Sequence, residues 1–198
     1  ISIPSVVILS ALFISLYGGS IRYTTPMLFA LAFLPMFGIG GLTGLPLGLS
    51  APDLHLHDTY YVIGHFHYVV APGTLMALFG GIYYWFPKAT GRKMNDMLGK
   101  IHFWTAVIAV NMTFFPMHFL GAAGMPRRVP DYPDAFAGWS MIASIGSFIS
   151  AAGIVLFIFI VAYTMIRGKK CEANPWGEGA DTLEWTVASP APFHTHEE

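Results

Sequence analysis

The chain has 198 residues, of which 55% are hydrophobic and only 11% are charged. Soluble domains carry about 25% charged residues, so this composition excludes an ordinary water-soluble domain. A formal net charge of −1 and the absence of a long basic tract argue against a protein that binds nucleic acid. The single cysteine, Cys171, excludes an internal disulfide and a cysteine-rich metal cluster.

The apolar residues gather in blocks, several of which reach the ~20 residues that a helix needs to cross a bilayer. This pattern predicts an all-α, polytopic membrane helical bundle with about five transmembrane helices over residues 1–170, followed by a polar carboxyl-terminal tail at 171–198. Because the chain begins inside an apolar block, without the basic region of a signal peptide, we expect a fragment, a processed piece or a separately encoded part of a longer polypeptide. The predicted helices cover residues 1–17, 26–49, 59–86, 97–123 and 137–166.

Basic residues predict which ends of these helices lie together. In a five-pass bundle, one side of the membrane contains Arg22 and the basic segments 88–100 and 167–170. Basic loops favour the cytoplasmic or matrix side of a membrane. Arg127 and Arg128 lie in a loop on the opposite side, against this trend, and they indicate a local anion.

The third block contains two histidines, His65 and His67, inside an apolar helix, where an ionisable side chain is costly and indicates function. Two residues along an α-helix correspond to a rotation of about 200°, so the two imidazoles point to opposite faces and do not share one metal. Each can bind a different cofactor, with Phe66 between them, and imidazole is a common axial ligand of heme iron. The spacing alone leaves open a pair of hydrogen-bonded structural histidines.

Just before this block, His57 and Asp58 end the acidic, histidine-containing loop predicted at 51–58. Hard divalent cations prefer carboxylate oxygens and retained waters. One His–Asp pair is too few ligands, so a metal here needs a partner chain. The alternative is that Asp58 caps the start of the helix.

Several strings resemble one family of membrane proteins. HDTYYVIGHFHYVV and, downstream, NMTFFPMHFLGAAGMPRRVPDYPDAF resemble subunit I of the heme–copper oxidases, the family of cytochrome c oxidase. GGSIRYTTPMLFALAF upstream and LEW with PAPFHTHEE in the tail fit the same order. The resemblance covers essentially the whole chain, and it implies helices eight to twelve of a twelve-helix subunit, plus the tail.

The resemblance implies roles for the two histidines. His65 would be the catalytic residue that ligates the high-spin heme a3, where oxygen is reduced beside copper. His67 would be an axial ligand of the low-spin heme a, and Phe66 would pack between the two hemes. The active-site copper would be held mainly by residues outside this chain.

Around these ligands the resemblance implies a polar shell. Arg127 and Arg128 would bind heme propionates, because a guanidinium matches a carboxylate in a bidentate fashion. Asp53 and Tyr60 would support the same propionates. His57 and Asp58 would hold magnesium or manganese at the boundary with subunit II.

The resemblance also exposes a departure in the first helix. Ser5, after Pro4, matches a polar group of a proton pathway, but Ile8 stands where the family usually has a lysine. Isoleucine cannot relay a proton. We therefore expect the lysine step to be absent, rerouted through water or supplied elsewhere.

The implied function is the carboxyl-terminal portion of a catalytic subunit that reduces oxygen to water with electrons from cytochrome c and pumps protons. The implied partners are the amino-terminal part of subunit I, subunit II with its dinuclear copper, subunit III, cytochrome c and the lipid bilayer, with no nucleic acid. The mitochondrial inner membrane is favoured over a bacterial plasma membrane. Two alternatives stay open: a quinol-oxidising relative, and a non-catalytic membrane scaffold derived from an oxidase fragment.

Overall fold

A computed structural model describes residues 2–193; Ile1 and residues 194–198, the end of the predicted tail, lie outside the described residues. The described part is helical, with isolated β-bridges and no named strand. The all-α prediction is therefore confirmed. The main helices are α1 (Ser2–Leu16), α2 (Thr25–Gly48), α3 (Ser50–Leu56), α4 (Tyr60–Val70), α5 (Met76–Thr90), α6 (Asp96–Ala122) and α7 (Ala137–Arg167).

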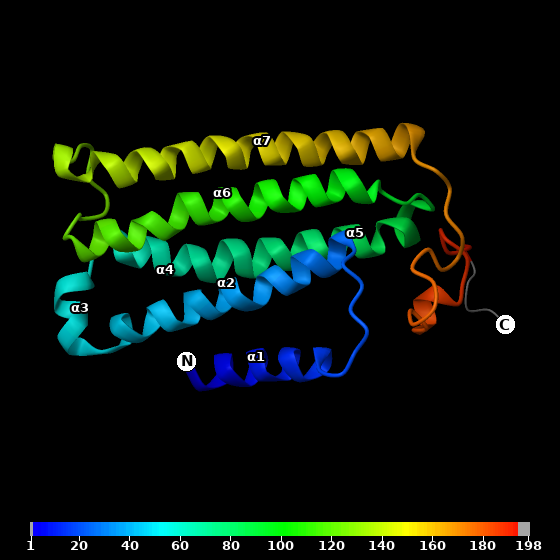
Figure 1. Ribbon diagram of the computed structural model, residues 1–198, viewed down its shortest axis with the longest axis horizontal. Coiled ribbons are helices and arrows are strands. Elements are labelled where there is room, and N and C mark those ends of the chain that lie inside the picture. The colour runs from blue at the N-terminus through cyan, green and yellow to red at the C-terminus, as the bar shows by residue number, and fades with distance from the viewer. Residues whose placement is uncertain (1, 194–198) are drawn as a thin grey trace.

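The long helices lie side by side in a bundle (Figure 1). α7 packs on α6, α6 packs on α4, and α2 packs on both α4 and α5, with α1 beyond α2. Four stretches of the described residues are long and apolar enough to cross a membrane: Thr25–Gly48, Tyr60–Thr90, Asp96–Ala122 and Asp134–Arg167. α1 is also apolar, but its 15 residues make it shorter than the other four.

The third predicted helix differs from a regular α-helix. α4 passes into a π-helical turn, η1 (Ala71–Leu75), before α5 continues along the same span. Pro72 lies in this turn, and proline lacks the N–H that a regular helix uses, so the wider turn absorbs the lost bond. The helix also passes its predicted end before Pro87 and stops at Thr90, where Gly91 takes a left-handed φ of 68°.

The segment predicted as a loop at 51–58 instead contains the short helix α3. Two local features favour a helix start here. Pro52 stands in the first turn, where its missing N–H costs nothing, and Asp53 places a negative charge near the positive end of the helix dipole.

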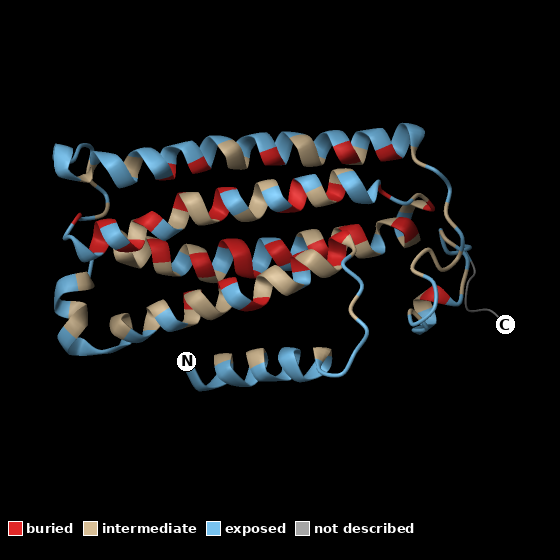
Figure 2. Cartoon of the chain, viewed as in Figure 1, coloured by how far each residue is buried: buried red, intermediate tan, exposed pale blue. Residues whose placement is uncertain are grey.

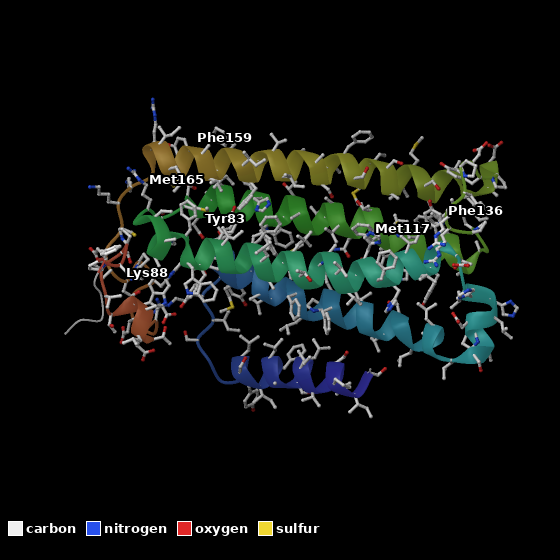
Figure 3. All side chains as sticks on the ribbon, turned by 180° about the vertical axis from the view of Figure 1, so that it is seen from behind. Tyr83, Lys88, Met117, Phe136, Phe159 and Met165 are labelled. Carbon is white, nitrogen blue, oxygen red and sulfur yellow. The ribbon has the colours of Figure 1, made fainter. Side chains whose placement is uncertain are left out.

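The predicted basic side is one end of the bundle, where the chain leaves α1, α5 and α7 (Figure 1). The described tail packs over this end. Lys88 Nζ donates to the Val187 carbonyl at 2.8 Å, and Arg22 Nη1 donates to the Trp176 carbonyl at 3.1 Å. Figure 3 shows Lys88 beside the tail, at the end of the bundle away from Phe136. Carbonyls of the tail therefore accept hydrogen bonds from basic side chains at this end of the bundle.

Aromatic side chains fix the tail to α5. The Trp176 ring stacks on the Tyr84 ring with 5.4 Å between centroids, and Trp185 Nε1 donates to the Tyr84 hydroxyl at 2.8 Å. Trp185 is only 2% exposed. The tail is thus folded against this chain's own bundle over the residues that the structure describes.

Among the helices, α6 has the most buried residues, and α1 has none (Figure 2). Phe29 of α2 lies at the centre of the core, and its ring stacks on that of Tyr83 with 5.7 Å between centroids.

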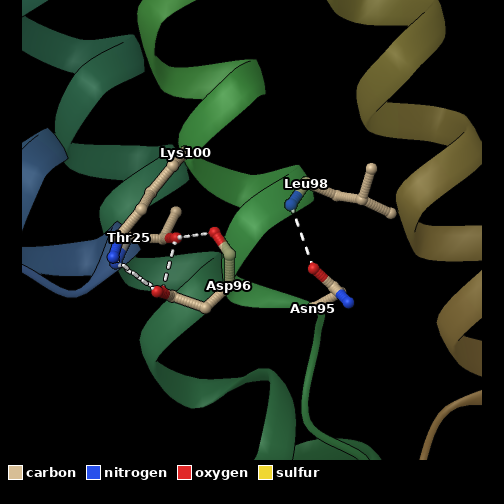
Figure 4. Close-up of polar contacts among 5 residues, drawn as sticks. All are labelled: Thr25, Asn95, Asp96, Leu98 and Lys100. Carbon is tan, nitrogen blue, oxygen red and sulfur yellow. Dashed lines mark hydrogen bonds and ion pairs between the residues drawn. The ribbon is translucent and has the colours of Figure 1, made fainter.

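The starts of α2 and α6 are joined by Asp96, whose Oδ1 accepts hydrogen bonds from the Thr25 backbone N–H at 3.0 Å and the Thr25 hydroxyl at 2.9 Å (Figure 4). Lys100 Nζ pairs with the other oxygen at 2.7 Å. This contact aligns two spanning helices.

Gly121 lies where α6 packs tightly on α4. A Cβ at Gly121 would collide with the backbone of Tyr61, whereas a Cβ at Gly41 would have no neighbour within 4 Å. Backbone cannot move aside as a flexible side chain can, so we expect Gly121→Ala to destabilise the bundle by about 2 kcal/mol or more. Gly41→Ala is the matched control and should be neutral. Thermal unfolding of the detergent-purified protein measures both, and equal melting temperatures for the two variants would contradict the packing.

Candidate functional site

The positions of the candidate residues depend on where α4 begins and which residue caps it. Thr59 is the N-cap of α4, and its hydroxyl accepts a hydrogen bond from the Tyr61 N–H at 3.3 Å. The Tyr60 N–H bonds to the Met125 carbonyl at 3.0 Å, and Thr59 forms a β-bridge with Pro126. The alternative in which Asp58 caps this helix is therefore wrong. Asp58 is free for another partner.

His65 faces α2. Its Nδ1 lies 2.8 Å from the Gly40 carbonyl oxygen and 3.3 Å from the Thr43 hydroxyl. A carbonyl oxygen can only accept, so Nδ1 carries the proton and Nε2 keeps its lone pair. A hydrogen bond of this kind fixes the tautomer and orientation of a metal-binding histidine. The ring also lies against Gly44, where a Cβ would collide with it.

His67 faces α6. Its Nδ1 lies 2.8 Å from the Ile63 carbonyl of its own helix, which again leaves Nε2 with a lone pair. The imidazole is stacked between two rings, Phe66 and Phe114, each with 4.3 Å between centroids. His65 and His67 thus contact different helices on opposite sides of α4, as their spacing predicts.

Small residues allow close packing where α2 meets α4. A Cβ at Gly40 would lie 3.0 Å from the backbone of Tyr68 and Val69. A side chain here would crowd the α4 backbone, so glycine favours this close approach of the two helices. The same approach brings the Gly40 carbonyl within hydrogen-bonding distance of His65.

At the end of the bundle that holds α3, Asp58 pairs with Arg127. Its Oδ1 accepts from Arg127 Nη2 at 2.6 Å and from Nε at 2.7 Å, and the Arg127 N–H bonds to the Asp58 carbonyl at 2.9 Å. This guanidinium holds the pKa of the Asp58 carboxyl below its ordinary value. Asp58 (φ 56°) and Arg128 (φ 61°) both adopt left-handed backbone, which is uncommon outside glycine. We call this ion pair, with the backbone bonds that join residues 58–60 to residues 125–127, the junction. Two residues with left-handed backbone conformation shape it.

His57 lies beside this junction. Its Nε2 is 3.6 Å from Asp58 Oδ2, and its side chain is 71% exposed. Within residues 2–193 no group of three or more His, Cys, Asp or Glu side chains is placed to hold a metal ion. Among the described residues, His57 and Asp58 therefore do not by themselves complete a site for a divalent cation.

The remaining candidates are spread more widely. Asp53, in α3, and Tyr60, at the start of α4, are half-buried at the same end of the bundle as Arg127. Ser5 and Ile8 lie in α1, which packs against α2, and Ile8 is 49% exposed. The structure does not bring these two near the Asp58–Arg127 pair.

A groove of about 1090 Å³ lies between α1, α2, α5 and the tail. None of the predicted site residues lines it. Its walls are mainly apolar, with Arg22 and Glu178 at the tail end.

Three residues around the histidines are missed by the sequence analysis: Gly40, Thr43 and Phe114. They contact His65 or His67 from α2 and α6, so the spacing of residues around the two histidines does not mark them. The glycines of α2 are a signal of close packing in general, but they do not indicate which one faces a histidine.

Comparison with known proteins identifies the chain's relatives. Residues 1–149 match the family described as cytochrome c and quinol oxidase polypeptide I. The chain belongs to this family. It is 47% identical over 199 residues to cytochrome c oxidase subunit 1 of Cereibacter sphaeroides, and 45% identical over 210 residues to that of Yarrowia lipolytica. These alignments cover 100% and 98% of this chain, and 35% and 39% of the two relatives.

The fold agrees with this membership. A solved heme–copper terminal oxidase dimer matches with a TM-score of 0.65 and 25% identity, over 75% of this chain and 28% of that one. The chain therefore spans little more than a third of the curated relatives' length.

The heme cofactors that the family implies suit the residues present. Each histidine commits Nδ1 to a backbone carbonyl and keeps the Nε2 lone pair, which is the donor that an axial iron ligand requires. Because the rings contact different helices, two separate groups could be ligated from one helix.

Asp58→Asn tests the junction. Asparagine tolerates a left-handed φ and keeps the shape, but it loses the charge that pairs with Arg127. We expect faster amide hydrogen exchange in residues 125–128, where the backbone bonds to residues 58–60 are made. Asp53→Asn is the control and should leave exchange in this loop unchanged. Protection at wild-type level in Asp58→Asn would contradict a supporting role for the ion pair.

Proposed function

We propose that the chain is the carboxyl-terminal portion of the catalytic subunit of cytochrome c oxidase, which reduces oxygen to water with electrons from cytochrome c and pumps protons. The observation that carries this proposal is the pair His65 and His67, each with a bonded Nδ1 and an open Nε2, on opposite sides of one helix. The high identity to two subunits named cytochrome c oxidase supports the choice of activity.

His65 is the proposed ligand of the high-spin heme a3 iron, and His67 the proposed ligand of the low-spin heme a iron. When bound, the hemes supply electron transfer and oxygen reduction. This chain's residues would bind and orient them. Phe66, 40% exposed between the two histidines, would pack against both groups.

Arg127 and Arg128 are the proposed partners of the heme propionates, supported by Asp53 and Tyr60. The pair with Asp58 uses Nε and Nη2 of Arg127 and leaves other guanidinium donors for an anion. Asp58 would thus hold the guanidinium in place.

His57 and Asp58 are the proposed ligands of a magnesium or manganese ion. Asp58 Oδ1 is engaged by Arg127, so Oδ2, which lies towards His57 Nε2, is the oxygen available to a cation. Two protein ligands do not complete such a site. Subunit II is the proposed source of the rest.

The proposal requires other chains. The amino-terminal part of subunit I would supply the copper ligands and the second ligand of the low-spin heme, and subunits II and III would complete the complex.

We divide the chain into a transmembrane segment at 1–170 and a tail at 171–198. Ser5 is the proposed group of a proton pathway that lacks a lysine at Ile8. The identities of 47% and 45% to the two relatives are too close to favour a mitochondrial over a bacterial membrane.

The test is to compare His65→Ala with His67→Ala in the assembled complex. Because the rings face different helices, we expect two different phenotypes. Loss of His65 should abolish carbon monoxide binding at the high-spin heme and leave the low-spin spectrum. Loss of His67 should remove or convert the low-spin heme and block electron entry. Identical heme spectra in the two variants would contradict the assignment.

A second prediction concerns the divalent ion. His57→Asn should weaken manganese binding about tenfold or more and leave heme content normal, since one of few protein ligands is lost. Paramagnetic resonance of the manganese-loaded complex measures this. His55→Asn, at another exposed histidine of the same segment, is the control. A manganese signal unaltered by His57→Asn would remove His57 from the site.

Two alternatives have a specific discriminating measurement each. The family description includes quinol oxidases, so the electron donor must be assayed with reduced cytochrome c and with quinol separately. A scaffold without heme would lack the reduced-minus-oxidised bands of heme a in the purified complex.

A further inference from the structure

We propose that Phe114 is a positioning residue that sets the plane of the His67 imidazole. The inference rests on the proposed function, in which His67 ligates the low-spin heme. Phe114 would act through His67 and need not itself contact the iron.

One hydrogen bond does not determine the plane of a histidine ring. The bond from Nδ1 to the Ile63 carbonyl fixes one edge of the His67 ring, but the ring can still tilt about this contact. What limits the tilt is the contact on each face. The Phe114 ring lies nearly parallel to the imidazole, at 11°, whereas the Phe66 ring is inclined by 30°.

Phe114 is also the more firmly supported of the two rings. Phe66 is 40% exposed and stands on the same helix as His67, so it moves with that helix. Phe114 comes from α6, which is tied to α4 one residue beyond His67. There the Tyr68 hydroxyl donates to Asn111 Oδ1 at 2.6 Å, and Asn111 Nδ2 donates to the Val107 carbonyl at 2.8 Å.

α7 supports the same part of α6 from the other side. A Cβ at Gly146 would lie 2.6 Å from the Thr113 backbone nitrogen, so the two helices are in close contact directly beside Phe114. The stacking ring thus stands on a segment held by α4 and by α7. An aromatic contact on such a support restricts a neighbouring ring more than an exposed one does.

His65 is held differently. Its Nδ1 bonds to the Gly40 carbonyl of α2, and the Thr43 hydroxyl lies beside the same nitrogen. No ring stacking involving His65 occurs among the described residues, residues 2–193. A change at Phe114 should therefore affect one ligand and leave the other.

The orientation of an axial imidazole affects the electronic structure of a low-spin ferric heme, and outer partners of a ligand tune the bound metal. The experiment replaces Phe114 by Leu, which keeps apolar bulk without a flat face, and by Tyr, which keeps the ring. Phe148→Leu is the matched control, because Phe148 is 76% exposed on α7. All variants are made in the assembled oxidase.

We expect Phe114→Leu to shift the paramagnetic resonance g values and the midpoint potential of the low-spin heme, at unchanged heme content. Electron transfer from this heme should slow about tenfold, as with other losses of support around a metal ligand. Carbon monoxide binding at the high-spin heme should stay the same. Phe114→Tyr should restore the wild-type g values, and Phe148→Leu should not alter them.

Wild-type g values and potential in Phe114→Leu would overturn the proposal. If the Leu variant loses both hemes, Phe114→Met, which also lacks a flat face, decides: wild-type heme content with shifted g values supports positioning, and wild-type content with unshifted g values overturns it. The ligand assignment is tested separately by His67→Ala. A low-spin heme that survives His67→Ala contradicts the proposed function, whereas its loss together with wild-type g values in Phe114→Leu contradicts only the role of Phe114.

Discussion

The close approach of α2 to α4 at Gly40 is the constraint on which the site depends. The absence of a Cβ at Gly40 lets the α2 backbone lie close to Tyr68 and Val69 without crowding, and this approach brings the Gly40 carbonyl to 2.8 Å from His65 Nδ1. Tyr68 also bonds to Asn111 of α6. Contacts with both α2 and α6 thus fix the rotation of α4, which directs one histidine toward α2 and the other toward α6. In lipid such polar contacts have no water to replace them, so they specify the arrangement strongly.

The positions of the spanning helices were predictable, because apolar length and the bilayer thickness leave few choices. So was the divergence of His65 and His67, which follows from helix geometry alone. The partners of these histidines were not predictable, because Phe114 and Gly40 lie 47 residues after and 25 residues before the histidines that they contact. Their identity depends on which helices become neighbours, and periodicity carries no information about that.

The alternative in which Asp58 caps α4 is wrong for a different reason. A carboxylate before an apolar helix favours an N-cap, and locally Thr59 and Asp58 are both good candidates. Asp58 instead takes a left-handed φ and turns towards Arg127, a residue 69 positions later. A tertiary ion pair therefore overrides the local preference. The sequence analysis missed the π-helical turn for a related reason. A helix can accommodate a proline such as Pro72 by a kink or by a π-helical turn, and the packing of the neighbouring helices selects one of them.

The location of that turn is part of how the ligand segment is kept regular. Pro72 interrupts the regular α-helical hydrogen bonding of the span from Tyr60 to Thr90, and the π-helical turn around it is confined to residues 71–75. His65 and His67 precede it, and the Tyr68 contacts with α2 and α6 lie between the histidines and the turn. The change of helical phase therefore occurs after the last contact that fixes α4. Had it occurred between the two histidines, their angular relation would no longer be that of a regular helix, and they would no longer face opposite neighbours.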